Sequence, residues 1–153
     1  MNIGLVAHDA RKNSLLEFVE YNGILLYDHE LYATGSTGKL ISNIPIVFSS
    51  DEDGDITGKL CVTCLKSGPL GGDQQMGAMI AEGKIDLLIF FVDCLSMQAH
   101  DSDIHALSRL AQLYNIPFAS NRATADYIIS SPLFNSQYVP KEPDFSNYLN
   151  RKL

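Results

Sequence analysis

Short apolar runs alternate with helical patterns along most of this 153-residue chain, and this alternation restricts the possible folds more than any other feature. The runs are Asn2–Ala7, Leu31–Thr34, Leu60–Leu65, Leu87–Val92 and Pro117–Ser120. Each is followed by a polar or glycine-containing turn and then by apolar residues at helical spacing. Strands that alternate with helices favour a parallel sheet covered on both faces. The pattern predicts a single α/β domain over residues 1–153, with three layers (α/β/α) and a central parallel sheet of about five strands.

Five helices are expected between and after these strands. Four have apolar stripes, namely Leu15, Leu16 and Val19; Leu40 and Ile41; Met76, Met79 and Ile80; and Ile104, Leu107, Leu110, Ala111 and Tyr114. The fifth is Asn121–Ser131, which Pro132 ends. We interpret the methionine and aromatic positions in these stripes as core residues.

The segment Asn43–Gly58 fits neither pattern and is expected to be an extended surface loop. Its acidic run Asp51–Asp55 suggests a calcium loop at first sight. However, Ile56 and Val62 stand where an EF-hand requires glycine and glutamate, so a solvated loop is favoured. The C-terminal segment Pro140–Leu153 has little core character and is expected to pack over the surface or against a partner.

The charge and hydropathy of the chain limit its partners. A net charge of −7 argues against nucleic acid or an anionic membrane as the main partner, although a small anionic ligand remains possible. No apolar run approaches the roughly 18 residues that span a bilayer. The N-terminus lacks the pattern of a signal peptide, so a cytoplasmic location is expected.

The cysteine and histidine spacings do not predict a metal or redox centre. Cys61 and Cys64 form a CxxC pair within a predicted strand, where residues three apart point to opposite faces. A redox or zinc site is therefore disfavoured, and buried, reduced thiols are expected. No metal site is expected, because no standard ligand spacing relates His8, His29, His100 and His105.

Polar and titratable side chains follow all five predicted strands, at the edge where ligands bind in open parallel sheets. Taken in strand order, they are His8, Asp9 and Lys12; Thr34–Gly38; Ser67, Gly68 and Asp73; Asp93, His100, Asp101 and Asp103; and Asn121, Arg122 and Thr124. Singly, each has an ordinary interpretation as a helix cap or loop residue. Five loops of this composition on one edge predict a functional site.

Two of these loops suggest the chemistry. Thr34–Gly38 (TGSTG) resembles a phosphate cradle, in which hydroxyls and a helix N-terminus donate to phosphate oxygens. It lacks the Walker A and GxGxxG patterns, which favours a lone phosphoryl group over a nucleotide. In Gly68–Gln75 (GPLGGDQQ), Asp73 follows two glycines at an expected helix start. A carboxylate beside an anion site, with a histidine donor, suits proton abstraction next to a carbonyl in a small phosphorylated substrate.

Seven segments resemble the methylglyoxal synthase family. They are LVAHD (5–9), YATGSTG (32–38), SGPLGGDQQ (67–75), EGKID (82–86), FFVD (90–93), HDSD (100–103) and NRATAD (121–126). The resemblance implies conversion of dihydroxyacetone phosphate to methylglyoxal and inorganic phosphate without cofactor or metal. It also implies a homohexamer that phosphate inhibits allosterically. The alternative is a non-catalytic, metabolite-sensing module of the same fold, such as the regulatory domain of carbamoyl phosphate synthetase.

The resemblance also assigns residues to roles. Asp73 would be the base, His100 would donate to the enediolate oxygen, Asp103 would orient the site, and Asp93 would support its geometry. The implied substrate and phosphate contacts are His8, Asp9, Lys12, Thr34, Gly35, Ser36, Thr37, Ser67, Gly68 and either Arg151 or Lys152. The chain departs from the family in its longer 43–58 segment and in having Cys94 and Ser102 where prolines are usual.

Overall fold

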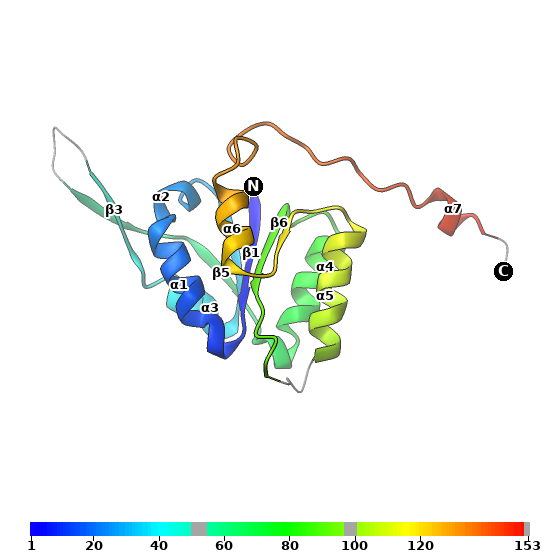
Figure 1. Cartoon of the computed structure of the whole chain (residues 1–153), viewed down its shortest axis with the longest axis horizontal. Coiled ribbons are helices and arrows are strands. Elements are labelled where there is room, and N and C mark those ends of the chain that lie inside the picture. Colours follow the sequence, from blue (N-terminus) through cyan, green and yellow to red (C-terminus); the bar gives the residue numbers. More distant parts are fainter. Residues whose placement is uncertain (50–54, 97–100, 152–153) are drawn as a thin grey trace.

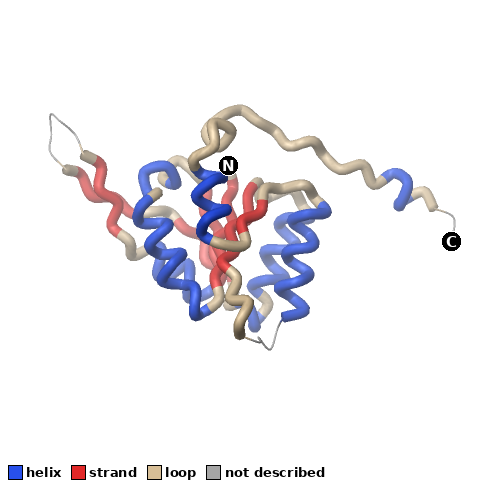
Figure 2. Tube along the Cα trace, viewed as in Figure 1, coloured by secondary structure: helices blue, strands red, loops and turns tan. Residues whose placement is uncertain are grey.

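The computed structural model describes residues 1–49, 55–96 and 101–151, which form a parallel sheet between two helical layers (Figures 1 and 2). The sheet has the order β5-β2-β1-β6-β7, and all its pairings are parallel. Its strands are β1 (Asn2–Ala7), β2 (Glu30–Thr34), β5 (Val62–Leu65), β6 (Leu87–Phe91) and β7 (Phe118–Ala119). The predicted α/β fold with a central parallel sheet is therefore confirmed.

The described α-helices are α1 (Lys12–Tyr21), α2 (Gly23–Leu26), α3 (Gly35–Ile41), α4 (Gly72–Ala81), α5 (Asp101–Leu113), α6 (Arg122–Ile129) and α7 (Ser146–Leu149). Five of them lie where the sequence patterns predict helices, whereas the short α2 and α7 were not predicted. Two short 3₁₀ helices, η1 (Asp9–Arg11) and η2 (Gly68–Leu70), lie between strand ends and helices. Each of η1, α3 and η2 starts within three residues of a strand end, which places their N-termini at the carboxyl edge of the sheet.

Alternation along the strands divides the core between the two faces of the sheet. In β6, Leu87, Ile89 and Phe91 pack with α1, α3 and α6, whereas Leu88 and Phe90 pack with α4 and α5. All five side chains are buried, as expected for a strand covered on both sides. Figure 1 shows the same division, with α1, α3 and α6 on one side of the sheet and α4 and α5 on the other.

The prediction of an irregular loop over 43–58 is wrong for its described part. Strands β3 (Pro45–Phe48) and β4 (Ile56–Lys59) pair antiparallel and form a separate hairpin that projects from the body (Figure 1). Ile46 anchors this hairpin in the core, and its side chain lies so close to Gly23 that a methyl group there would be 2.2 Å from it. Phe48 packs edge-on against Tyr27 with ring centroids 4.7 Å apart. The β-branched and aromatic run Ile46–Phe48 carried this signal, which the acidic run beside it obscured.

The prediction of buried thiols is also wrong. Cys61, Cys64 and Cys94 are free cysteines, and all three are exposed. Strand β5 lies at the edge of the sheet and pairs only with β2 among the described strands, so its residues are less covered than those of β1 or β6. Cys61 precedes the first residue of β5.

The C-terminal segment does not pack over the body as a whole. Phe145 contacts Tyr114 with ring centroids 5.5 Å apart, and the Lys141 carbonyl accepts a hydrogen bond from Asn115. Beyond these contacts the segment projects outward as an arm that carries α7 (Figure 1). Tyr148 and Leu149 on this arm are 62% and 75% exposed. The expected packing against a partner stays a prediction.

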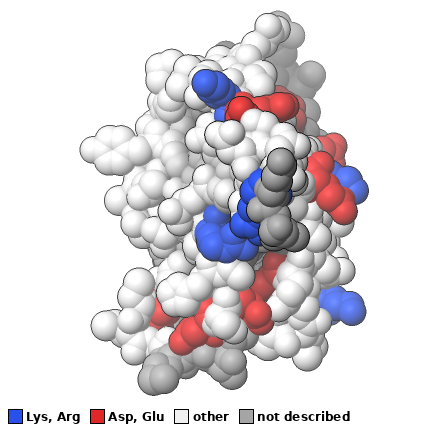
Figure 3. All heavy atoms as spheres, turned by 90° about the vertical axis from the view of Figure 1, so that its right-hand side faces the viewer, with Lys and Arg blue, Asp and Glu red and all other residues white. Residues whose placement is uncertain are grey.

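No helix among the described residues is long and apolar enough to cross a membrane. Figure 3 shows a small group of basic side chains near the centre of one face, with acidic side chains above and below it.

Candidate active site

A cavity of about 290 Å³ lies at the carboxyl edge of the sheet, at the end of β1. Strand β1 has β2 on one side and β6 on the other, so the strand order reverses there. This is where open α/β sheets bind their ligands. It is lined by residues that follow β1, β2 and β5 and by one residue of β6. The lining residues are Val6, Ala7, His8, Asp9, Lys12, Thr34, Ser36, Thr37, Ser67, Gly68, Pro69, Asp73 and Phe90. Eight of the implied substrate contacts are thus brought together around one space.

The predicted phosphate cradle forms one wall of the cavity. Thr34 ends β2, and the backbone then turns directly into α3, whose first N–H groups have no partners within the helix. Thr34 and Thr37 are buried beside these groups. Gly35 has φ +34°, and a side chain there would lie 2.6 Å from the Ser67 hydroxyl. A glycine is therefore required where the cradle contacts the next loop.

Lys12 brings positive charge to the cradle from α1. Its ammonium donates to the Ser36 hydroxyl at 2.7 Å and to the Asp9 carboxylate at 2.5 Å. The lysine side chain is only 20% exposed, whereas Asp9 is 95% exposed. A phosphate dianion in the cavity would therefore meet a partly desolvated cation together with hydroxyl and helix N-terminal donors.

Asp73 lines the same cavity as the cradle. It is the second residue of α4 and is 3% exposed. The backbone of Gly68 lies against its carboxylate, because a methyl group added there would be 2.9 and 3.1 Å from the two carboxylate oxygens. The expectation that glycine allows close approach beside this acid matches the geometry, although the group approached within the chain is the acid itself.

His8 has a defined tautomer. The backbone N–H of Asp93 donates to His8 Nδ1 at 2.8 Å. A backbone N–H can only donate, so Nδ1 carries no proton, and the ring is a neutral imidazole with its proton on Nε2. Phe90 packs against this ring with centroids 5.1 Å apart. His8 therefore lines the cavity as a neutral imidazole.

Asp93 supports this histidine from the end of β6. The Ser96 side chain and the Leu95 backbone N–H donate to its carboxylate, and Arg11 adds a guanidinium at 3.4 Å. In that order of importance these groups hold the pKa of Asp93 below its ordinary value. Asp93 is therefore a carboxylate at neutral pH and holds His8 through its backbone, which fits the supporting role implied for it.

The other predicted site residues do not all lie at the cavity. Asp103, in the first turn of α5, lines a smaller hollow of about 280 Å³ that Asp73 also borders. The backbone N–H of Gly35 donates to the Lys66 carbonyl at 3.1 Å, so this group is engaged within the protein. Arg151 is on the projecting arm, where it stacks on Tyr148, and is not among the described lining residues. His100 and Lys152 lie outside the described residues.

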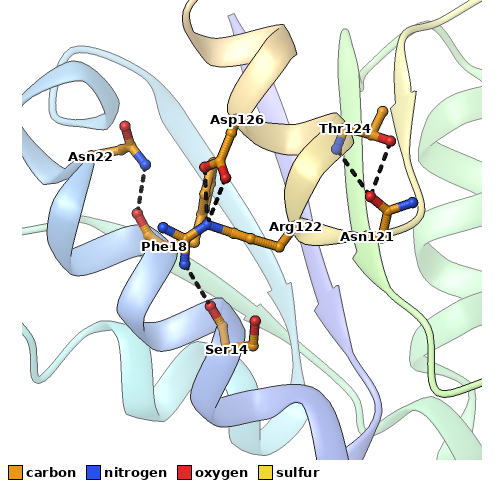
Figure 4. A network of polar contacts seen from close by, with 7 residues as sticks. All are labelled: Ser14, Phe18, Asn22, Asn121, Arg122, Thr124 and Asp126. Carbon is orange, nitrogen blue, oxygen red and sulfur yellow. Dashed lines mark hydrogen bonds and ion pairs between the residues drawn. The ribbon is translucent and has the colours of Figure 1, made fainter.

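The loop after β7 has a structural role (Figure 4). Asn121 caps α6 by accepting from the Thr124 backbone N–H at 3.0 Å. Arg122 bonds Asp126 and the Ser14 carbonyl of α1, and its guanidinium lies 5.4 Å from the Phe18 ring centroid. These residues dock α6 on α1, so their polar character reflects packing.

Within residues 1–49, 55–96 and 101–151, no group of three or more histidine, cysteine, aspartate or glutamate side chains could hold a metal ion. The cavity is lined by a buried carboxylate, a neutral imidazole, a lysine and several groups that can donate hydrogen bonds to phosphate oxygens. This set suits acid–base chemistry on a small phosphorylated molecule.

Comparison with known proteins identifies the family. The family model described as MGS-like domain matches residues 14–120. Methylglyoxal synthase of Maridesulfovibrio salexigens is 53% identical over 155 residues, which cover 99% of this chain and 97% of the relative. The chain belongs to the methylglyoxal synthase family. Methylglyoxal synthase of Proteus mirabilis is also 53% identical, over 99% of this chain and 91% of its own length.

The fold agrees with a solved structure of the methylglyoxal synthase family. The crystal structure of methylglyoxal synthase from Elizabethkingia anophelis NUHP1 superposes with a TM-score of 0.84 at 43% identity, covering 99% of this chain and 91% of that one. The resemblance of the seven motif segments to the methylglyoxal synthase family is thereby confirmed over nearly the whole chain.

The sequence motifs did not indicate how the loop after β2 and the loop after β5 are joined. The Lys66 carbonyl accepts from Gly35, and the Lys66 N–H donates to the Gln75 side chain at 2.8 Å. Gln75 belongs to the GGDQQ segment, but without a structure its partner could not be identified. The apolar lining residues Pro69 and Phe90 likewise gave no signal beyond their place next to strand and loop ends.

Replacing Lys12 with methionine is expected to weaken phosphate binding about 10- to 100-fold, because a charge-assisted hydrogen bond is lost in a partly buried site. The measurement is a calorimetric titration with inorganic phosphate. Lys39→Met, an exposed lysine of α3, is the matched control and should leave the affinity unchanged. Equal affinities for the two variants would contradict the placement of phosphate in this cradle.

Proposed function

We propose that this protein is a carbon–oxygen lyase that converts dihydroxyacetone phosphate to methylglyoxal and inorganic phosphate. The observation that carries the proposal is one cavity lined by both the phosphate cradle and the buried Asp73 carboxylate. Strong support comes from relatives that are named methylglyoxal synthase and are about half identical over nearly the whole chain.

In this proposal the substrate phosphate binds at Lys12, Ser36 and Thr37. Asp73 then takes a proton from the hydroxymethyl carbon, the electrons of that C–H bond form a double bond to the carbonyl carbon, and the carbonyl oxygen accepts a proton. The hydroxyl on the deprotonated carbon then forms the aldehyde, the double bond shifts to the third carbon, the C–O bond to phosphate breaks, and the hydroxyl proton passes to the departing phosphate. The resulting enol loses its hydroxyl proton and gains a proton on its terminal carbon, which gives methylglyoxal and replaces the proton that Asp73 removed.

The enediolate intermediate requires fixed donors, because a carboxylate is a weak base towards a carbon acid. Triosephosphate isomerase forms the same kind of intermediate with a carboxylate and a neutral histidine. Here the defined tautomer of His8 gives the lining of the cavity a neutral imidazole. His100 as the enediolate donor and Asp103 as the orienting acid stay predictions.

Elimination additionally requires the scissile C–O bond to lie perpendicular to the enediolate plane, where it overlaps the π system. We infer that the donors from α1 and α3 hold the phosphate out of that plane. Such an arrangement favours loss of phosphate over isomerisation of the triose. The cradle also stabilises the charge that develops on the departing group.

The direct test is to incubate the purified protein with dihydroxyacetone phosphate in buffer containing a chelator and to quantify both products. Methylglyoxal and phosphate in a 1:1 ratio, suppressed by added phosphate, are expected. The alternative, a non-catalytic metabolite sensor of the same fold, predicts phosphate binding without product. The buried base beside the cradle favours the enzyme, since a sensor needs no base there.

The family resemblance further predicts a cytoplasmic homohexamer that phosphate inhibits allosterically. The exposed apolar residues Tyr148 and Leu149 of the arm support assembly, since a second copy would remove them from water. Arg151 follows α7 on the same arm, which projects from the body of its own chain. We therefore propose that, if Arg151 binds phosphate, it does so in the site of another copy.

Removing residues 140–153 is expected to lower the oligomeric mass, because the arm would no longer link the subunits. Light scattering on the full chain and the shortened chain measures this. A full chain with the mass of one subunit would contradict the hexamer. A shortened chain that kept the full oligomeric mass would contradict the role of the arm.

A further inference from the structure

The backbone of one residue, Lys66, connects the phosphate cradle to the helix that carries Asp73. The Lys66 carbonyl accepts the Gly35 N–H at 3.1 Å, which ties it to the start of the phosphate cradle. The Lys66 N–H donates to Gln75 Oε1 at 2.8 Å, which ties it to α4, the helix that carries Asp73. The cradle and the base are thus connected through two hydrogen bonds to the same short stretch of backbone.

The backbone around Lys66 leaves little room for α4 to move. A methyl group added to Gly72, the first residue of α4, would be 2.0 Å from the Lys66 carbonyl oxygen. The Gly72 N–H also donates to the Ser67 carbonyl at 2.9 Å. The start of α4 is therefore pressed against the strand end on one side. Gln75, one turn further, is the side chain that holds the helix there.

Gln75 does not act by contact with the reacting groups. Residues two apart on a helix point in nearly opposite directions, so its side chain turns away from that of Asp73. It is exposed and is not among the residues described as lining the cavity. Any effect of Gln75 on the reaction must therefore act through its hydrogen bond with the Lys66 backbone.

We propose that Gln75 is a positioning residue. By holding α4 against the Lys66 backbone, it fixes the position of the Asp73 carboxylate relative to the bound phosphate. The inference rests on the proposed lyase function and adds to it a determinant of the geometry between base and substrate. Proton abstraction depends steeply on such geometry, and a displacement of about 1 Å can cost about 100-fold in rate. Phosphate binding depends on the cradle alone and should respond much less.

The test uses the full-length protein with three variants. Gln75→Met keeps the length of the side chain but removes the acceptor, whereas Gln75→Glu keeps an acceptor oxygen. Gln74→Met makes the same change at the neighbouring exposed glutamine and is the matched control. The measurements are kcat, KM, the dissociation constant for inorganic phosphate from calorimetry, and the melting temperature.

We expect Gln75→Met to lower kcat about 10- to 100-fold, with the phosphate dissociation constant within about twofold of the wild type. Gln75→Glu should restore kcat to near the wild-type value, and Gln74→Met should not change it. If the wild type turns over and kcat of Gln75→Met stays within twofold, the positioning role is overturned. The role is overturned equally if glutamate fails to rescue, or if phosphate affinity falls as much as kcat. A wild type that binds phosphate but makes no product would instead overturn the proposed lyase, which the calorimetry distinguishes.

Discussion

Asp73→Asn is expected to lower kcat by about 10³- to 10⁴-fold, because the amide has the shape of the carboxylate but cannot accept the proton. The amide fits against Gly68 as the acid does, so the fold and the cradle should be retained. Phosphate should therefore bind with near wild-type affinity. Turnover of dihydroxyacetone phosphate and calorimetric titration of phosphate, run on the same preparation, measure the two effects separately.

The matched control for this substitution is Asp28→Asn, at an exposed aspartate that is not among the described residues lining the cavity. It should leave both turnover and phosphate affinity unchanged. If Asp73→Asn kept more than a tenth of the wild-type turnover, Asp73 could not be the base. Loss of phosphate binding together with turnover would point to a damaged site and would not support the assignment.

Gly72→Ala is expected to have the second large effect, on stability and on turnover together. The added methyl group would lie 2.0 Å from the Lys66 carbonyl oxygen and within 3 Å of two further backbone atoms. Backbone atoms cannot rotate away as a flexible side chain can, so α4 or the strand end must shift. We expect a loss of about 2–4 kcal/mol in unfolding free energy. Turnover should fall strongly, because Asp73 is the next residue.

Gly83→Ala separates this clash from the general cost of replacing a glycine. Gly83 has φ +67° and no atom within 4 Å of an added methyl group, so only backbone strain of about 1 kcal/mol is expected. Urea unfolding and turnover of the two variants provide the comparison. A Gly72→Ala variant as stable and as active as Gly83→Ala would show that the contact with Lys66 is not tight in solution.

The fold was largely predictable from sequence because the strands of a doubly covered sheet are continuous apolar runs. Leu87–Phe91 is the clearest example, since all five of its residues are buried. Residues at the functional edge were predictable for a related reason. Loops that follow parallel strands must meet at one edge, so His8, Thr34 and Asp73 converge although they are far apart in sequence.

The features that were missed depend on contacts that spacing does not determine. The pairing of Pro45–Phe48 with Ile56–Lys59 depends on anchorage of Ile46 against Gly23, and nothing local to the hairpin indicates this. The exposure of Cys64 follows from the edge position of β5, which is set by sheet order. The hydrogen bond from Lys66 to Gln75 joins a strand end to a helix, so its existence also depends on the assembled fold.

The central claim is that the cradle holds the substrate phosphate out of the plane of an enediolate that Asp73 generates. The structure of a complex with 2-phosphoglycolate, a planar carboxylate that cannot eliminate phosphate, tests it most directly. We expect the phosphate on Lys12, Ser36 and Thr37, with the C–O bond to phosphate steeply inclined to the carboxylate plane and Asp73 facing the carboxylate oxygen that stands for the deprotonated carbon. An in-plane C–O bond, or a phosphate bound away from this cradle, would contradict the account.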